Sequence, residues 1–452
     1  MGRLQKIDKE RKRGILFHHM NRFKNLARQA GYALLCGLVP AAVPVSAQSS
    51  PRPFPSPPST ASTALLLHEG DRVLFYGDSI TAQRIYTRFL EDIVVSRYPA
   101  LHVEFFNAGV SGDTVNGGSA GDAALRLGRD VFPRHPSVVT VMLGMNDGHY
   151  RTGNEADRAA FDAGYRALLD ALHTNLPSAS IFLIRPSPYD EIAHVPNVSG
   201  YNSVLAGFGD DVASLGQQRG LHTCDLNGAM QHALQQGIVL EPQLAGTLLP
   251  DRIHPSEAGH WILALSLAQC FGVDPMVSSV SVDAADVKTL DAYKAAVTDL
   301  RKTSQGIEWT QLDAALPLPL ELNSPETSFL LKVSQLAEWD RQMLQVRRLP
   351  AARYNLMIDG EKISTLDSAA LETGVNLALL ETPMQKQSRA IDWKTDSRAK
   401  ISATRFNLLT ASPAIQDLSD ALSAIDELDR RMLNDERRQA QPKPHHISLM
   451  RE

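Results

Sequence analysis

Short apolar runs alternate with longer helical patterns over residues 64–275. Enough chain separates consecutive runs for a crossover helix, which is the connection that joins parallel strands. Strands covered by helices on both faces appear in a sequence as continuous apolar runs. The pattern therefore predicts a three-layer α/β/α domain with a parallel five-stranded sheet. The five expected strands are 72–76, 103–108, 138–143, 181–185 and 221–226.

Beyond this domain the alternation stops. Apolar residues recur at helical spacing over 287–300 and again over 415–432, which predicts amphipathic helices. Between them, apolar and polar residues alternate over 354–364 on either side of Asp359-Gly360, the dipeptide of a tight hairpin turn. We expect residues 276–452 to form a mainly helical C-terminal region that contains a β-hairpin.

A basic segment precedes the α/β pattern. Residues 1–47 hold nine Lys or Arg against two acids, and a positive stretch leads into an apolar segment that ends before Ser46-Ala47. This order is typical of a secretory signal peptide, and the apolar segment is short and broken by prolines. We expect cleavage after residue 47, no stable membrane span afterwards, and export to the periplasm or the cell exterior. Residues 48–63, rich in Pro and Ser, are expected to be a linker.

Composition narrows the choice of function. Hydrophobic residues make up 43% of the chain and charged residues 21%, enough for a globular protein with a sizeable core. Residues 48–452 carry a net charge of −12, which does not suit binding to nucleic acid phosphates. Only Cys224 and Cys270 follow the signal segment. They are either a disulfide formed after export or a pair of buried thiols.

Residues that could carry chemistry follow the expected strands. Ser79 follows the first strand, Gly112 the second and Asn146 the third, while Asp251 and His254 follow the fifth. The carboxyl ends of parallel strands meet at one edge of a sheet, so we expect these residues to converge. A serine hydroxyl becomes a nucleophile when an imidazole takes its proton and a carboxylate orients that imidazole. The pattern predicts Ser79 as nucleophile, His254 as base and Asp251 as the orienting acid.

Ester cleavage also needs hydrogen-bond donors for the oxyanion of the tetrahedral intermediate. The backbone N–H groups of Ser79 and Gly112 and the side-chain amide of Asn146 are the expected donors. Gly112 has no side chain, which lets a substrate approach its N–H closely. Asp147 and Tyr189 follow the third and fourth strands and are candidates for contact with substrate.

Two rival interpretations compete for the same residues. Gly117-Gly-Ser119-Ala-Gly121 matches the nucleophile-elbow pattern Gly-x-Ser-x-Gly, but an elbow needs a buried strand before it and residues 112–116 are polar. A metal-dependent phosphoesterase would need a richer set of histidines than this rim offers. We therefore expect neither a metal nor another cofactor. The ligands of that rival site would be Asp78, Asn107, Asp113, Asn146, Asp147, Asp251 and His254.

Four short motifs together resemble a known family. They are Gly77-Asp78-Ser79, Gly112 within Asn-x-Gly-x-x-Gly-Asp-Thr, Asn146 within Gly-x-Asn-Asp, and Asp251-x-x-His254. In this order they resemble the four blocks of the SGNH hydrolase, or GDSL esterase/lipase, superfamily. The resemblance covers about residues 70–270 and implies a flavodoxin-like fold, serine-dependent ester hydrolysis and no metal. It assigns the nucleophile, base, acid and oxyanion donors to the residues named above.

The resulting expectation is a secreted serine ester hydrolase that works through an acyl-enzyme. Its substrate would be a small ester or an acylated carbohydrate, with O-acetyl groups as the acyl groups removed. A lysophospholipase or thioesterase of the same family is the alternative among enzymes. A different class of function is an inactive SGNH scaffold with a binding module in residues 276–452.

Overall fold

The computed structural model describes residues 64–153, 155–411 and 418–452. The expected signal peptide and linker lie outside the described residues. The N-terminal domain is built on a parallel sheet in the order β2-β1-β5-β6-β7, which is the flavodoxin-like order. This confirms the expected α/β fold class. The strands are β1 (Arg72–Gly77), β2 (Glu104–Gly109), β5 (Val138–Met142), β6 (Ser180–Ile184) and β7 (His222–Cys224).

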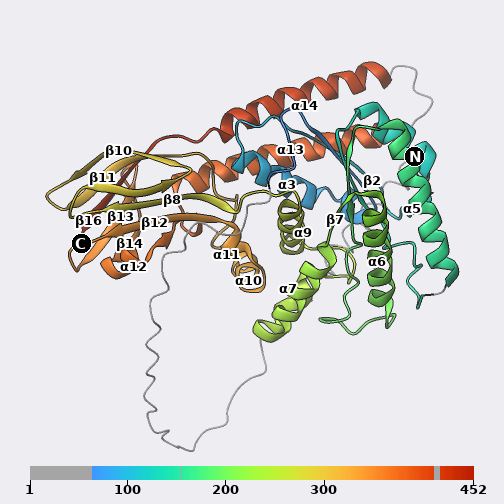
Figure 1. Cartoon of the computed structure of the whole chain (residues 1–452), viewed down its shortest axis with the longest axis horizontal. Coiled ribbons are helices and arrows are strands. Elements are labelled where there is room, and N and C mark those ends of the chain that lie inside the picture. Colours follow the sequence, from blue (N-terminus) through green and yellow to red (C-terminus); the bar gives the residue numbers. More distant parts are fainter. Residues whose placement is uncertain (1–63, 154, 412–417) are drawn as a thin grey trace, which may run out of the picture. The chain divides into compact units, whose positions relative to one another are not determined.

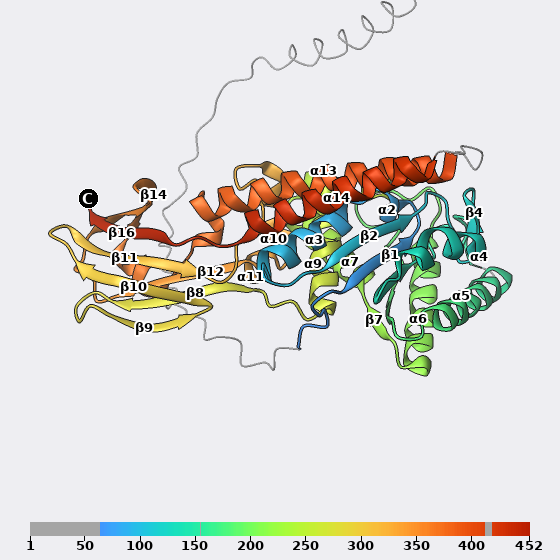
Figure 2. The same ribbon diagram turned by 90° about the horizontal axis from the view of Figure 1, so that it is seen from above.

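Helices cover both faces of this sheet, as the continuous apolar strands require. Figure 2 shows α3 (Ile85–Arg97) and α9 (Glu257–Cys270) on one side and α5 (Glu155–Asn175) and α6 (Tyr201–Arg219) on the other. Stacked aromatic rings join each pair: Phe89 on Trp261 and Phe161 on Phe208. The inner strand β1 is consequently buried on both faces.

Shorter elements complete the domain. The helices are α2 (Ser79–Ala82), α4 (Ala123–Arg126), α7 (Leu226–Leu240) and α8 (Pro242–Ala245), with single helical turns at Leu127–Val131, Phe132–Arg134 and Gly246–Leu248. A two-residue hairpin consists of β3 (Gly117–Gly118) and β4 (Gly121–Asp122).

Cys224 and Cys270 form a disulfide, with their Cα atoms 5.7 Å apart. Of the two states that the sequence left open, the structure has the bonded one. The bridge ties the end of the edge strand β7 to the end of α9, the helix that follows the loop carrying His254.

The C-terminal region contains two further sheets that share one hydrophobic core, in which Trp309 is fully buried. Their orders are β10-β11-β16-β13-β14 and β15-β12-β8-β9. The strands are β8 (Met276–Asp283), β9 (Lys288–Tyr293), β10 (Ala295–Lys302), β11 (Gly306–Asp313), β12 (Arg341–Arg347), β13 (Arg353–Ile358), β14 (Glu361–Asp367), β15 (Val375–Asn376) and β16 (His445–Arg451).

The expected hairpin is present as β13 and β14, and both residues of its turn, Asp359 and Gly360, have positive φ angles. Two long helices, α13 and α14, also belong to this region. Helix α14 overlaps the helix that was expected at 415–432, of which residues 415–417 lie outside the described part. The helices are α10 (Pro325–Val333), α11 (Leu336–Trp339), α12 (Ser368–Thr373), α13 (Pro383–Ala411) and α14 (Leu418–Ala440), with one turn at Leu377–Leu379.

The helix expected over residues 287–300 is wrong, because this segment forms β9 and β10. A β-bulge between Thr298 and Arg301 explains the misleading spacing. The extra residue shifts the alternation, so Val297 and Leu300 both pack against the core although they are three positions apart. In β9 every residue is exposed, so Leu290 carries no pattern of burial.

Helices α13 and α14 run side by side, and α13 packs against α3 (Figure 1). Helix α13 also lies beside β2, which is an edge strand of the parallel sheet. Arg437 of α14 donates to the backbone oxygen of Val103, just before β2, at 2.9 Å. Among the described residues, no helix is both long and apolar enough to cross a membrane.

Candidate active site

The end of β1 places Ser79 at the first position of α2. Asp78 is the N-cap of this helix, and its Oδ1 accepts the N–H of Ile80 at 3.0 Å. A side chain at Gly77 would collide with Thr81, since a Cβ there would lie 2.3 Å from Thr81 Oγ1. Glycine at this position lets the chain turn tightly from strand to helix, which leaves the Ser79 N–H free at the helix N-terminus.

The loop before α9 holds the histidine and the acid. Asp251 Oδ1 accepts the N–H groups of Ile253 at 3.0 Å and His254 at 2.7 Å, which closes the loop on itself. Asp251 Oδ2 lies 2.7 Å from His254 Nδ1, and His254 Nε2 lies 2.8 Å from Ser79 Oγ. The structure therefore brings the three predicted residues into one hydrogen-bonded chain.

The charge of Asp251 determines which atoms donate and which accept in the hydrogen bonds between Asp251, His254 and Ser79. Burial by itself would raise the pKa of Asp251, but the hydrogen bonds from the backbone and ring of His254 and from Ile253 outweigh it and lower the pKa. Asp251 is thus ionised at neutral pH and accepts a proton from Nδ1. His254 Nε2 is then an acceptor facing the Ser79 hydroxyl, as a general base requires.

The three expected oxyanion donors keep unused N–H groups. Neither the N–H of Ser79 nor that of Gly112 has an acceptor in the described part of the chain. Gly112 is exposed with a φ of +80°, and a Cβ built on it meets nothing within 4 Å, so this face is open to a substrate. Asn146 Nδ2 donates to the backbone oxygen of Asp113 at 2.9 Å, which places this amide beside Gly112 and leaves its second N–H available.

Comparison with known proteins agrees with this geometry. Residues 75–262 match the GDSL-like Lipase/Acylhydrolase family, and this stretch contains all four motifs. The α/β domain belongs to the GDSL-like lipase/acylhydrolase family. The chain is accordingly a hydrolase of carboxylic esters.

Two proteins illustrate how far the likeness extends. An acetylxylan esterase from Geobacillus stearothermophilus is 25% identical over 224 residues, which cover 45% of this chain and 95% of that protein. A solved structure titled BT4096, a gut microbial diltiazem-metabolizing enzyme, superposes with a TM-score of 0.76 at 23% identity, over 85% of this chain and 98% of that one. The second likeness concerns fold alone, and it extends beyond the GDSL domain into the C-terminal region.

Pattern analysis missed one residue of the GDSL site, Tyr150. Its hydroxyl donates to Asn146 Oδ1 at 2.9 Å. Burial raises the pKa of Tyr150 to about 12, so this hydroxyl keeps its proton at neutral pH. With Oδ1 held by Tyr150 and one N–H held by Asp113, the Asn146 amide has a single orientation. Tyr150 stands four positions after Asn146 in a loop with no periodicity, and no signal marked it beyond its closeness to the motif.

The loop that carries Gly112 is anchored by buried charge. Arg126 is fully buried and forms ion pairs with Asp113 and Asp130, and it also donates to the backbone oxygen of Ala108. The guanidinium therefore joins the end of β2 to the turn that presents the Gly112 N–H.

Asp147 and Tyr189, the predicted substrate contacts, lie in buried positions around the GDSL site. Asp147 is 6% exposed, and its Oδ1 accepts the N–H of Val115 at 3.0 Å. Burial raises the pKa of Asp147 to about 6. Tyr189 is 5% exposed and packs edge-on against Tyr201. Asp147 thus joins two loops and Tyr189 packs on the first residue of α6, and contact with substrate stays a prediction for both.

The rival sites fare differently from the GDSL triad. Ser119 lies in the exposed turn between β3 and β4, whereas Ser79 is the serine that contacts an imidazole. Within residues 64–153, 155–411 and 418–452, no group of three or more His, Cys, Asp or Glu is placed to hold a metal ion.

Proposed function

We propose that this protein is an exported serine esterase that cleaves its substrate through an acyl-enzyme at Ser79. The Ser79 hydroxyl attacks the ester carbonyl while His254 Nε2 takes its proton. The resulting oxyanion accepts hydrogen bonds from Ser79, Gly112 and Asn146. Collapse of the intermediate breaks the bond to the alkoxide, which receives the proton from His254 and leaves as an alcohol. Water then attacks the acyl-enzyme with His254 as base, and a carboxylic acid is released.

The observation that carries this proposal is the position of His254. One ring nitrogen lies 2.7 Å from an ionised carboxylate and the other lies 2.8 Å from a hydroxyl at a helix N-terminus. This arrangement activates the serine before substrate arrives, because the imidazole tautomer and the direction of proton transfer are already set.

We propose O-acetyl groups on carbohydrate as the substrate. The acetylxylan esterase relative supports this choice, and so does the openness of the rim. The side chain of Asp251 is 58% exposed and Gly112 is exposed. Apart from its two chain neighbours, no described residue lies within 4 Å of a Cβ built on Gly112. An open rim admits a bulky saccharide on the alcohol side of the ester while a small acyl group reaches Ser79.

Labelling with a fluorophosphonate tests the nucleophile. We expect a covalent adduct on Ser79 that disappears in Ser79→Ala and persists in Ser119→Ala, the matched serine of the rival motif. Peptide mass spectrometry identifies the modified residue. An adduct that depends on Ser119 would move the nucleophile to the β3–β4 turn, and the absence of any adduct in the folded protein would favour the inactive scaffold.

Acyl-chain preference tests the substrate class. We expect higher kcat/KM for p-nitrophenyl acetate than for the octanoate, and release of acetate from acetylated xylan. The lysophospholipase and thioesterase alternatives predict the reverse order or a clear preference for thioesters. Either result would reject the carbohydrate deacetylase.

Export is part of the proposal and has its own support. The basic and apolar pattern of residues 1–47 suits a signal peptide, and a disulfide such as Cys224–Cys270 persists in an oxidising compartment. Cell fractionation followed by N-terminal sequencing should find mature protein that begins at Gln48. A full-length cytoplasmic protein with free thiols would contradict this part of the proposal.

A further inference from the structure

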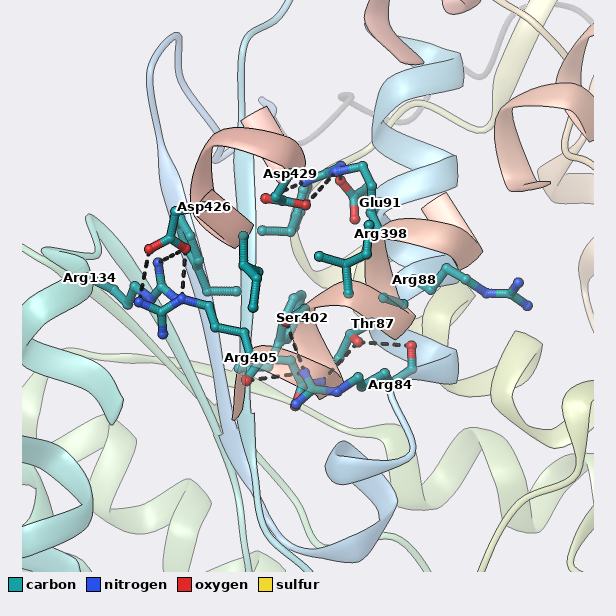
Figure 3. A pocket seen from close by; sticks show the side chains of 17 residues that line it. Arg84, Thr87, Arg88, Glu91, Arg134, Arg398, Ser402, Arg405, Asp426 and Asp429 are labelled. Carbon is teal, nitrogen blue, oxygen red and sulfur yellow. Dashed lines mark hydrogen bonds and ion pairs between the residues drawn. The ribbon is translucent and has the colours of Figure 1, made fainter. Parts of the chain in front are cut away.

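A cavity of about 50 Å³ lies between the GDSL domain and the helices α13 and α14 (Figure 3). Its walls come from α3, β1, β2, α13 and α14, and Phe75, Phe105 and Phe106 form an apolar part of the lining. At roughly 10–15 Å³ per water, this space corresponds to about four waters or one very small ligand. None of the residues assigned above to ester cleavage lines it.

Arg84 is the unusual member of this lining. Arg84 is the N-cap residue that precedes α3, its φ is +64°, and only 7% of the residue is exposed. Nη1 donates to two neutral acceptors, the backbone oxygen of Asn107 at 3.2 Å and Ser402 Oγ at 3.4 Å. Nε and Nη2 have no acceptor within the described ranges of the chain. Burial lowers the pKa of Arg84 to about 10, so the group stays cationic at neutral pH.

The other arginines of the cavity are all paired with carboxylates. Arg398 pairs with Glu91, Asp429 and Glu436, and Arg134 and Arg405 share Asp426. Arg88 pairs with Asp392 and Asp396, and its guanidinium points away from that of Arg84 (Figure 3). Five arginines and three carboxylates line the cavity, and Arg84 has no carboxylate partner in the described part of the chain.

A buried charge without a counter-charge is costly, because burial removes the water that solvates it. Around Arg84 this water is replaced only by two neutral acceptors and by the ring of Phe406, whose centroid lies 5.9 Å from Cζ. We propose that the Arg84 cavity binds a short-chain carboxylate, which supplies that counter-charge. A carboxylate matches the planar guanidinium fork, and Nε and Nη2 are the pair of donors that remain unused. The Ser402 hydroxyl donates to no other described group, so it provides a further donor.

The volume and the aromatic lining of the cavity favour a small carboxylate over other oxyanions. Acetate has four non-hydrogen atoms and suits the volume, and its methyl group suits the aromatic wall of Phe75 and Phe105. A phosphate dianion would place polar oxygens against that wall. If the proposed function holds, acetate is also the product of the reaction, and Arg84 lies only five residues beyond Ser79. The cavity would then bind the released acid at a position separate from the triad.

Saturation-transfer NMR on the acetate methyl group tests the site directly. The protein is the Ser79→Ala variant at pH 7.5, so the measurement does not depend on turnover, and chloride replaces acetate to keep ionic strength constant. We expect a saturable signal in this variant. In Ser79→Ala/Arg84→Met the Kd for acetate should rise at least about tenfold, because a charge-assisted hydrogen-bonded pair is lost. Arg88→Met in the same background is the matched control and should retain the signal.

Further arms make the outcome decisive. Arg84→Lys keeps the charge without the fork and should bind more weakly than arginine; it also serves if Arg84→Met does not fold, which circular dichroism reports. An equal acetate signal with methionine at position 84 would overturn the proposal, as would an equal signal from the neutral isostere acetamide. Displacement of acetate by phosphate but not by propionate would overturn the assignment to carboxylates. Fluorophosphonate labelling of wild-type protein reports separately on the proposed function.

Discussion

The rim around Ser79 and the junction between α3 and the helices α13 and α14 differ in whether their hydrogen-bond donors have partners. At the rim, the N–H groups of Ser79 and Gly112 have no acceptor in the described chain, and the space beside Gly112 is open. At the junction, Arg398 is only 4% exposed and is surrounded by Glu91, Asp429 and Glu436. Unpaired N–H donors mark a surface kept for another molecule, whereas the donors of Arg398, paired with carboxylates, mark a surface that holds the protein together. The Arg84 cavity combines burial with unused donors.

The largest expected effect comes from breaking the junction. Arg398→Met leaves Glu91 and Glu436 buried without their cation, which should lower the free energy of unfolding by about 3–5 kcal/mol. Urea denaturation measures the change. Activity per folded molecule should stay within about twofold of wild type, a change of under about 0.5 kcal/mol in the barrier. The exposed Arg431→Met is the matched control and should leave stability nearly unchanged. A stable Arg398→Met protein would contradict the role given to the junction.

Removing a donor from the rim should have the opposite signature. Asn146→Ala is expected to lower kcat by about 10²–10³, because one hydrogen bond to the oxyanion is lost in the transition state. Steady-state kinetics with an acetyl ester measure it, and thermal unfolding should show little change. If kcat were unaffected, Asn146 would be a loop support and the oxyanion hole would have to be rebuilt from other donors.

The buried carboxylate behind the nucleophile predicts a dependence of stability on pH. Burial raises the pKa of Asp78 to about 7 from 3.8, and the nearby charges of Asp147 and Asp113 add to the rise. Between these two pH values the folded state binds more protons than the unfolded state, so stability falls as pH rises from 4 to about 7.

Asp78→Asn keeps an N-cap acceptor and removes this titration. Denaturation at a series of pH values should show a loss of stability between pH 4 and about 7 that is smaller than in wild type, by roughly 4 kcal/mol at most. Identical pH profiles for the two proteins would show that Asp78 is ionised throughout.

The smallest effect should come from Tyr150, which acts through Asn146. Tyr150→Phe removes the hydrogen bond to Asn146 Oδ1 and should lower kcat about tenfold with little change in KM, since the amide loses its fixed orientation. Tyr354→Phe in the C-terminal region is the matched control, because it also removes one hydrogen bond of a tyrosine hydroxyl, here to the backbone oxygen of Pro350 outside the GDSL domain. A rise in KM at constant kcat would make Tyr150 a substrate contact instead of a positioning residue.

Sequence reasoning located the parallel sheet because its strands are covered on both faces. Such strands are continuous apolar runs, and their ends are followed by short turns whose residues have few alternatives. Ser79 and His254 could be paired in advance because strand order places both loops at the same edge of the sheet. Tyr150 could not be predicted, since its contact with Asn146 depends on two consecutive residues, His149 and Tyr150, that adopt positive φ angles in an aperiodic loop.

The C-terminal sheets were harder for a physical reason. Strand β9 is exposed along its whole length and β10 contains a bulge, so neither shows a clean alternation of two. The β13–β14 hairpin was predictable because its Asp-Gly turn and its alternating buried residues agree. The site at Arg84 could not be predicted either, because its lack of a carboxylate partner depends on α13, which is distant in the sequence and packs beside Arg84 in the fold.

The position of α13 beside β2 has a practical consequence for dividing the protein. Strand β2 ends the parallel sheet, and a free sheet edge is a template on which a second molecule can add a strand. A chain shortened to residue 275 would keep every group of the triad yet lose the cover over that edge. Such a fragment should self-associate. The shortest soluble form of the protein should therefore extend well past His254, because it has to include the helix that covers β2.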